Sequence, residues 1–316
     1  MKVFFLQGEQ LSAVPRELRS GAPGPRAIRA LLAGPTVRER NVGYRTAFPA
    51  GTRLVRFSAS SGAAVVSLRT PPPTPSAFAA SLIPARGAQV GFTLRPLGYA
   101  HVSLVVNGHT VGTPQSPAPP GPPPQPPVLT PDTAAPADTL LVQTQLNSMR
   151  FLPKDAVTGR WDYRTEQAVI AAQAWNGLAR DGVVGPMSLG VLAQGLIPSP
   201  SVLTPGRHLE VYRYLGVTLL VQNGVTLRAV HVSSGRTPGF TTPSGMFTVV
   251  RKERYSWSVP YRVWLPYASY FHNGIAFHAY PEIPATPASH GCVRVAYPEA
   301  GTVYAFATLG TPVYVY

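Results

Sequence analysis

The hexapeptide SHGCVR at residues 289–294 contains Cys292, the only cysteine among 316 residues. A single thiol cannot form an intramolecular disulfide, so Cys292 does not stabilise the fold by cross-linking. Its neighbours are small, polar or ionisable, whereas a structural cysteine packs as a small hydrophobic side chain. His278 lies fourteen positions upstream, and a nearby imidazole increases the thiolate fraction of a cysteine. The pattern therefore predicts a nucleophilic Cys292.

These residues resemble the signature of the L,D-transpeptidase catalytic domain (the YkuD family). That signature has a first histidine, a variable stretch, Ser/Thr-His-Gly-Cys, an aliphatic residue, and Asn or Arg. Here ten residues separate His278 from the hexapeptide, slightly fewer than in many members, which implies a shortened loop beside the site. Upstream, VSSG at 232–235 and TPSGMF at 242–247 match the family's second recurring element.

The resemblance implies acyl transfer with Cys292 as the nucleophile and His278 as the general base. In an extended segment His290 shares a face with Cys292, so it is expected to orient the site or support the oxyanion. We expect the amides of Gly291 and Cys292 to be oxyanion donors. Arg294 is expected either to hold a substrate carboxylate or to form a structural salt bridge.

Two further residues complete the expected site. Ser289 is expected to form hydrogen bonds within the motif, because a thiolate is the stronger nucleophile at neutral pH. Tyr261 precedes His278 at about the distance where transpeptidases carry a tyrosine near the oxyanion. Tyr255, Tyr267 and Tyr270 compete for that role.

A zinc site is the alternative use of these side chains, since His278, His290 and Cys292 are residue types that bind zinc. No Cys-x-x-Cys or His-Glu-x-x-His spacing accompanies them, and the resemblance implies a metal-free enzyme. We therefore expect neither a metal nor a cofactor.

Eleven prolines between residues 114 and 136 divide the chain. Such a run favours extended polyproline II structure and predicts a semi-rigid linker over 114–136. We expect one domain over 1–113, a second over 137–198 and the catalytic domain over 203–316.

The first segment alternates strand patterns with a helical stretch at 27–33. The dipeptide Asn107-Gly108 predicts a hairpin turn. The Gly-Pro ending of the helix and TAFPAG at 46–51 resemble the GerMN domain of sporulation and germination proteins. That resemblance implies a small α/β domain with no catalytic residues. The expected strands cover residues 3–6, 54–57, 65–68 and 102–106.

Three short helices are predicted over residues 138–196. Ala168, Val169, Ala172 and Trp175 form one apolar helix face. The sequence DGVVGP at 181–186 predicts a tight turn whose proline opens the next helix. The segment resembles a peptidoglycan-binding three-helix domain. Trp175 is open to two interpretations, stacking on a sugar ring or packing in the core.

Residues 209–316 have an almost entirely β pattern. Asn-Gly at 223–224 and at 273–274 predicts two hairpins, and the second places His278 on a strand. A mainly-β sandwich or barrel is expected, in agreement with the transpeptidase resemblance. The fold class is therefore multidomain: N-terminal α/β, a small all-α segment, and a mainly-β C-terminal domain.

The net charge of +14 comes from 27 basic and 13 acidic side chains. The arginines are scattered and no nucleic-acid motif is present, so no nucleic-acid partner is expected. A diffuse positive surface suits an anionic polymer such as the carboxylate-rich cell envelope, or serves solubility alone. No apolar run approaches the ~20 residues of a membrane span. The first residues contain too short an apolar run for a signal peptide.

The resemblances together imply a cysteine-dependent L,D-transpeptidase of the bacterial cell envelope, in the periplasm or the cell wall. We expect an exported protein whose signal is absent from this sequence. Cys292 would form a thioester with a peptidoglycan stem peptide, release D-alanine and pass the acyl group to a neighbouring stem. The N-terminal segments would tether the enzyme to the wall. The alternatives are an L,D-carboxypeptidase-type hydrolase and a catalytically silent wall-binding protein.

Overall fold

The chain forms two compact units. Met1–Pro122 and Trp257–Trp264 make one, and Pro123–Ser256 and Leu265–Tyr316 make the other. The predicted linker, residues 114–136, lies outside the part of the chain that the structure describes. No helix in the described part is both long enough and apolar enough to cross a membrane. The computed structural model describes residues 1–17, 21–71, 79, 82–111 and 139–316.

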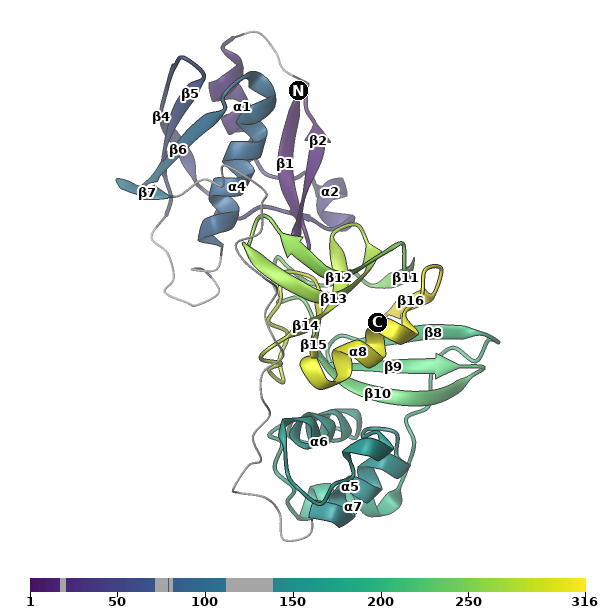
Figure 1. Ribbon diagram of the computed structural model, residues 1–316. Helices are drawn as coiled ribbons and strands as arrows, with labels where there is room; N and C mark the ends of the chain where they lie inside the picture. Colours follow the sequence, from purple (N-terminus) through teal and green to yellow (C-terminus); the bar gives the residue numbers. More distant parts are fainter. Residues whose placement is uncertain (18–20, 72–78, 80–81, 112–138) are drawn as a thin grey trace. The chain divides into compact units, whose positions relative to one another are not determined.

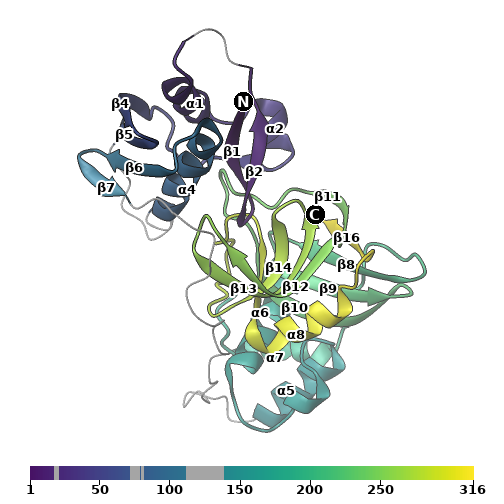
Figure 2. The same ribbon diagram turned by 45° about the horizontal axis from the view of Figure 1, so that its top comes forward.

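The N-terminal unit is an α/β domain with helices between two sheets (Figures 1 and 2). The sheets have strand orders β2-β1-β3 and β4-β5-β6-β7. Helix α1 contacts β1 and β4, and helix α4 contacts β1 and β6. The elements are β1 (Lys2–Gln7), β2 (Gln10–Pro15), α1 (Pro23–Leu32), α2 (Val37–Asn41), β3 (Tyr44–Arg45), β4 (Arg53–Ser60), β5 (Ala63–Arg69), α4 (Ile83–Leu94), η1 (Arg95–Leu97), β6 (His101–Val106) and β7 (His109–Val111).

The expected elements of this domain are present. The four predicted strands fall within β1, β4, β5 and β6, and α1 forms at the predicted helix. Ala27, Ile28 and Leu31 on α1 are fully buried, because their spacing places them on one helix face. At the predicted hairpin, Asn107 and Gly108 have φ values of 51° and 86°. These left-handed conformations are what a type I′ turn between β6 and β7 requires.

The C-terminal unit carries most of a nine-stranded sheet with the order β11-β16-β8-β9-β10-β15-β14-β13-β12 (Figure 1). The strands β14 and β15 pair in parallel, whereas β14 pairs with β13 in antiparallel fashion. The tip of the β12–β13 hairpin, Trp257–Trp264, groups with the other unit. The strands are β8 (Arg207–Tyr212), β9 (Val217–Gln222), β10 (Val225–Ser233), β11 (Gly245–Thr248), β12 (Arg251–Ser258), β13 (Val263–His272), β14 (Ile275–Tyr280), β15 (Val293–Ala296) and β16 (Pro312–Val315).

One helix, α8 (Tyr297–Phe306), interrupts the β pattern expected over residues 209–316. It begins with a proline in its first turn and buries Ala300 and Val303 against the sheet. Figure 1 shows α8 lying across the strands, and it contacts β14 and β15. The short apolar residues of this segment are compatible with either a strand or a helix by pattern alone, and packing against the sheet decides for the helix.

The described part of the middle segment folds into three α-helices, as predicted: α5 (Thr139–Ser148), α6 (Tyr163–Trp175) and α7 (Pro186–Gln194). A short 3-10 helix, η2 (Lys154–Ala156), lies between α5 and α6. Asp162 caps α6 by accepting a hydrogen bond from Thr165 N at 2.8 Å. Gln143 is fully buried and accepts hydrogen bonds from Thr158 N at 2.9 Å and Gly159 N at 2.8 Å. A buried amide that ties down loop backbone in this way fixes the α5–α6 connection.

The three helices share one hydrophobic core with the β-sheet. Val169 and Ala172 on α6 belong to the same buried cluster as Val217 and Leu219 on β9. Trp175 at the end of α6 packs edge-on against Tyr212 of β8, with ring centroids 5.0 Å apart. Of the two interpretations of Trp175, the structure shows the packing contact. The three-helix segment therefore forms one body with the sheet, which differs from a separate tethered module.

Buried polar contacts join the same two parts. Glu299 of α8 accepts from Arg164 Nε at 2.6 Å and from Arg228 Nη2 at 2.8 Å. His231 of β10 lies 2.6 Å, through Nδ1, from Gln167 Oε1 of α6. Burial lowers the pKa of His231 to about 3, so the ring is neutral near pH 7 and Nδ1–H donates to Gln167.

Truncation of a core residue on the sheet is expected to loosen the helices as well. Leu219→Ala removes a side chain of 0% exposure and should lower the free energy of unfolding by about 2–5 kcal/mol. Leu227→Ala, at a position 48% exposed, is the matched control and should stay within about 0.5 kcal/mol. Hydrogen exchange read by mass spectrometry should quicken in α6 as well as in β9. Faster exchange confined to β9 would contradict the shared core.

Candidate active site

The alternation of side chains along β14 and β15 gives the sheet a core face and a site face. Phe277, Ala279, Val293 and Val295 lie in the core beside α8. Successive residues of a strand point to opposite faces, so His278 lies on the other face. The paired position of His278 on β15 is Arg294.

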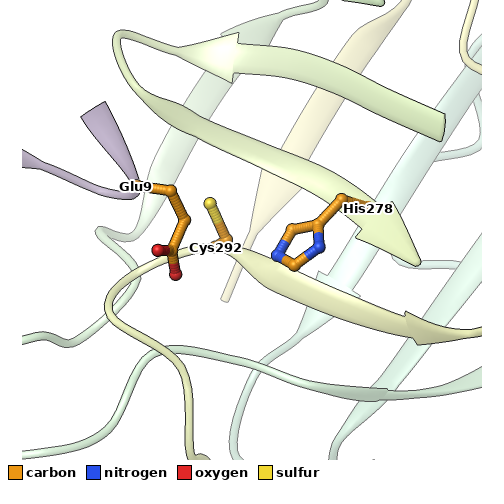
Figure 3. Close-up of side chains that lie close together, drawn as sticks. All are labelled: Glu9, His278 and Cys292. Atoms are coloured by element: carbon orange, nitrogen blue, oxygen red, sulfur yellow. The ribbon is translucent and has the colours of Figure 1, made fainter. Parts of the chain in front are cut away.

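Cys292 and His278 lie side by side on this face (Figure 3). A ring nitrogen of His278 and Cys292 Sγ lie within 4.8 Å of each other, and both residues are buried. Cys292 directly precedes β15, and His278 is the fourth residue of β14. The parallel pairing of these strands thus brings together two residues that are fourteen positions apart.

The hydrogen bond of His278 fixes its tautomer. Its Nδ1 lies 2.9 Å from the carbonyl oxygen of Ala279. A carbonyl only accepts hydrogen bonds, so Nδ1 carries a proton, and in the neutral ring Nε2 carries the lone pair. The imidazole is thereby presented as a base through Nε2.

Two backbone groups near the start of β14 contact the thiol. Ala276 N donates to Cys292 Sγ at 3.3 Å, and the Gly274 carbonyl lies 3.6 Å from Sγ as an acceptor. The sulfur thus accepts a hydrogen bond from one backbone group and donates one to another, as a neutral thiol can.

Ser289 closes the turn that precedes Cys292. Its Oγ donates to the Cys292 carbonyl at 2.5 Å and accepts from Gly291 N at 3.1 Å. The Gly291 N–H is therefore engaged within the turn. Gly291 has φ +120°, a conformation that side chains with a Cβ rarely adopt.

The two upstream motifs pack directly against this turn. Thr242 Oγ1 accepts from Gly235 N at 2.8 Å and donates to the Gly291 carbonyl at 2.8 Å. Gly235 leaves no room for a side chain, since an added Cβ would lie 2.0 Å from the Phe240 carbonyl oxygen and 2.8 Å from Gly291 Cα. The VSSG and TPSGMF motifs are recognisable in the sequence, but their residues were not predicted to take part in the site. The glycine and the threonine at fixed positions in these two motifs were the sequence features that could have indicated a role in the site.

Arg294 stacks on an aromatic ring. Its guanidinium carbon lies 3.8 Å from the centroid of the Tyr280 ring, and Tyr280 is in turn edge-on to His278 at 6.1 Å. Arg294 forms no ion pair with an acidic side chain in the described residues. Its Nε is buried without a hydrogen-bond partner in that part of the chain. The structural salt bridge that was one expectation for Arg294 is therefore not found among the residues that the structure describes.

The remaining candidates lie as follows. His290 is buried and its ring packs edge-on against Phe240, with centroids 5.5 Å apart. Tyr261 lies in the Trp257–Trp264 tip, which groups with the other unit, so its role near the oxyanion stays a prediction. Of the competing tyrosines, Tyr270 is fully buried and shares a hydrogen bond of 2.9 Å with Ser256.

Comparisons with known proteins give three family matches in chain order. Residues 2–112 match a domain described as sporulation and spore germination, and residues 136–192 match a putative peptidoglycan binding domain. Residues 210–315 match the L,D-transpeptidase catalytic domain. No curated protein matches the chain.

One solved structure in particular supports the third match. The crystal structure of the L,D-transpeptidase from Xylanimonas cellulosilytica is 32% identical and has a TM-score of 0.51, and the match covers 63% of this chain and 100% of that one. The chain belongs to the L,D-transpeptidase family. An L,D-transpeptidase from Stackebrandtia nassauensis is 23% identical with a TM-score of 0.39, covering 59% of this chain and 97% of that one.

The sequence-based recognition is therefore confirmed for all three segments. The match to the Xylanimonas L,D-transpeptidase covers more of this chain than residues 210–315. The structural likeness thus extends beyond the catalytic domain of this L,D-transpeptidase family member.

The close approach of Gly235 to Gly291 gives a direct test of the site's architecture. Gly235→Ala should displace the turn before Cys292, because its Cβ cannot fit 2.0 Å from the Phe240 carbonyl oxygen. We expect the rate of Cys292 alkylation by iodoacetamide to change at least tenfold. Gly301→Ala is the control, since nothing lies within 4 Å of its added Cβ and alanine favours a helix. An unchanged alkylation rate in Gly235→Ala would contradict the packing argument.

Proposed function

We propose that this chain is a cysteine-dependent L,D-transpeptidase that acts on the stem peptides of peptidoglycan. The observation that carries the proposal is the pairing of Cys292 Sγ with a His278 imidazole whose Nδ1 is tied to a carbonyl. A nucleophile, an oriented base and a fixed tautomer are the minimum that thiol-based acyl transfer needs. Membership of the L,D-transpeptidase family supports the same reaction class.

In the first half-reaction, His278 Nε2 takes the thiol proton and Cys292 Sγ attacks a carbonyl carbon. That carbonyl belongs to the amide between the third stem residue and the terminal D-alanine. The tetrahedral intermediate collapses, the C–N bond breaks, and His278 returns the proton to the leaving amine of D-alanine. A thioester joins Cys292 to the remaining stem.

In the second half-reaction, the side-chain amine of a neighbouring stem attacks the thioester carbon. The C–S bond breaks, the amine's proton passes through His278 to the departing thiolate, and an amide joins the two third residues. The sum exchanges one amide for another, so no energy-carrying cofactor is needed. The Cys292 amide is the oxyanion donor of this proposal, since Gly291 N–H is engaged with Ser289.

Arg294 is proposed to bind a carboxylate of the stem. Its guanidinium stacks against the Tyr280 ring, so the N–H groups at the edge of the guanidinium remain able to bind an anion. Its Nε has no hydrogen-bond partner in the described residues. Bidentate recognition of carboxylates is the usual function of such an arginine. His290, packed against Phe240, is proposed to orient the turn that holds Cys292.

The other segments are proposed to serve attachment. The three-helix domain, proposed over 137–198, would bind the wall, and the domain over 1–113 would have no catalytic residues. The catalytic domain is proposed to span 203–316, and the protein to work in the cell envelope. The matches to peptidoglycan-binding and transpeptidase domains support these assignments.

Product analysis tests the reaction and its acceptor. We expect the full chain, incubated with tetrapeptide-containing muropeptides, to release D-alanine and form cross-linked dimers detected by mass spectrometry. Cys292→Ala should do neither, because the chain has no other thiol. Tripeptide monomers without dimers would show a hydrolase and not a transferase, and unchanged muropeptides would support the silent wall-binding alternative.

A carbapenem should add one covalent mass to the wild type and none to Cys292→Ala.

Loss of the base should slow acylation without unfolding the protein. We expect His278→Ala to lower the carbapenem acylation rate by roughly 10²–10⁴-fold, the range of a lost general base. His109→Ala, at an exposed position of β7, is the matched control and should acylate at the wild-type rate. Circular dichroism checks that both variants fold. If His290→Ala were slower than His278→Ala, the roles of the two histidines would be exchanged.

A further inference from the structure

The loop of residues 281–288 connects the two reacting side chains, because it joins the end of β14 to Ser289. Its C-terminal end is held by β10. Ser233 Oγ donates to the Thr286 carbonyl at 2.8 Å and accepts from Ala288 N at 3.1 Å. The Ser234 carbonyl accepts from Ser289 N at 3.0 Å. This end of the loop is thus fixed by the catalytic domain itself.

The N-terminal end of the loop is held by the three-helix segment. Ile283 N donates to the hydroxyl oxygen of Tyr163, the first residue of α6, at 3.3 Å. Ile283 is 4% exposed, so its amide has little access to water as an alternative partner. Burial raises the pKa of Tyr163, which keeps the hydroxyl protonated and neutral at neutral pH.

Arg164, the next residue of α6, binds the segment that follows the Cys292 motif. Arg164 donates to Glu299 at 2.6 Å, and Glu299 lies in the first turn of α8, directly after β15. Arg228 of β10 binds the same carboxylate at 2.8 and 3.2 Å. Because this cluster is buried, loss of one partner would leave an uncompensated charge. The start of α6 is thereby fixed relative to the catalytic sheet.

Two adjacent residues of α6 therefore hold the segments on both sides of the Cys292 motif. We infer that the three-helix segment positions the active site, with Tyr163 as a positioning residue that sets the 281–288 loop. This inference rests on the proposed function for its catalytic consequence. The loop is a connection without secondary structure of its own, and such connections are mobile unless tied down. A shift of the first residues of the loop would move the end of β14. The position of the His278 imidazole relative to the Cys292 thiol would change with it.

The inference gives the peptidoglycan-binding-like segment a second role besides attachment. A tether acts only through local concentration, so its removal or alteration leaves the chemistry of Cys292 unchanged. A positioning element changes the reactivity of the thiol itself. The single cysteine makes this difference measurable, since every alkylation event reports on Cys292.

The test compares three single substitutions in the full chain. Tyr163→Phe removes the hydroxyl that accepts from Ile283 and keeps the ring, while Ser233→Ala removes the anchor at the other end of the loop. Tyr214→Phe, at a position 59% exposed, removes a hydroxyl from the surface. Each variant is assayed for kcat and KM with a tetrapeptide muropeptide, for the pH profile of iodoacetamide alkylation, and for hydrogen exchange of residues 281–288.

For Tyr163→Phe we expect kcat to fall about 3–10-fold, the factor that one hydrogen bond is worth, with KM within twofold. The alkylation profile should move to higher pH, because the imidazole is less well placed to take the thiol proton. Exchange of the loop should quicken. Ser233→Ala should change in the same direction, and Tyr214→Phe should match the wild type.

A wild-type kcat, pH profile and loop exchange in Tyr163→Phe would overturn the inference. A fall in thermal stability with an unchanged pH profile would also overturn it, since it would assign Tyr163 a purely structural role. The proposed function fails on a separate result, the absence of D-alanine release by the wild type or its persistence in Cys292→Ala. The alkylation and exchange measurements need no substrate and test the positioning in either case.

Discussion

The parallel pairing of β14 with β15 is the constraint on which the rest of the site depends. It sets His278 opposite Arg294 and places Cys292 one residue before the paired stretch. Side chains alternate along both strands, so a slip of one residue would move the site face into the core. Phe277 and Val293 resist such a slip, because they fill the core beside α8. Parallel strands also require a connection that leaves and re-enters the sheet, which here is the 281–288 loop.

The buried polar contacts between α6 and the sheet specify an arrangement more than they add stability. Removing Glu299 and its two arginines from water costs about as much as their attraction returns, so such a cluster is weak evidence of net stabilisation. It does demand one docking geometry, since a displaced helix would leave charges unpaired. The neutral His231, which donates to Gln167 at 2.6 Å, adds a second such demand. Its depressed pKa of about 3 means that the unfolded chain binds an extra proton below pH ~6.5. The contribution of this contact between β10 and α6 to the free energy of unfolding therefore falls as pH falls from about 6.5 toward 3. Above pH ~6.5 that contribution does not change.

The features that could be predicted from the sequence are those whose conformation depends on residues adjacent in the chain. The Asn-Gly hairpins formed because Asn223 and Gly224, at φ 51° and 74°, adopt left-handed conformations at low cost. Helix α4 was not predicted, since Gly87, Val90, Gly91 and Thr93 are weak helix formers. It is helical because burial of Ala85, Ala88 and Leu94 against both sheets outweighs that propensity. The candidate pair of Cys292 and His278 came from residue types and spacing. The contributions of Gly235, Thr242 and Tyr163 depend on contacts between distant segments, which no single stretch of sequence encodes.

In the proposed reaction, the base His278 is oriented by a backbone carbonyl group. In a serine hydrolase the base is oriented by a carboxylate, whose charge also stabilises the imidazolium that forms when a hydroxyl is deprotonated. The Nδ1 of His278 instead donates to the Ala279 carbonyl at 2.9 Å. That group fixes the tautomer and the ring orientation but brings no full negative charge. A thiol needs less help than a hydroxyl, because its ordinary pKa of about 8.5 lies close to neutrality. Transfer of its proton yields a thiolate and an imidazolium within 4.8 Å, and the two charges stabilise each other. In the proposed reaction, the acidity of the Cys292 thiol therefore lowers the need for the charge that a carboxylate supplies beside a serine.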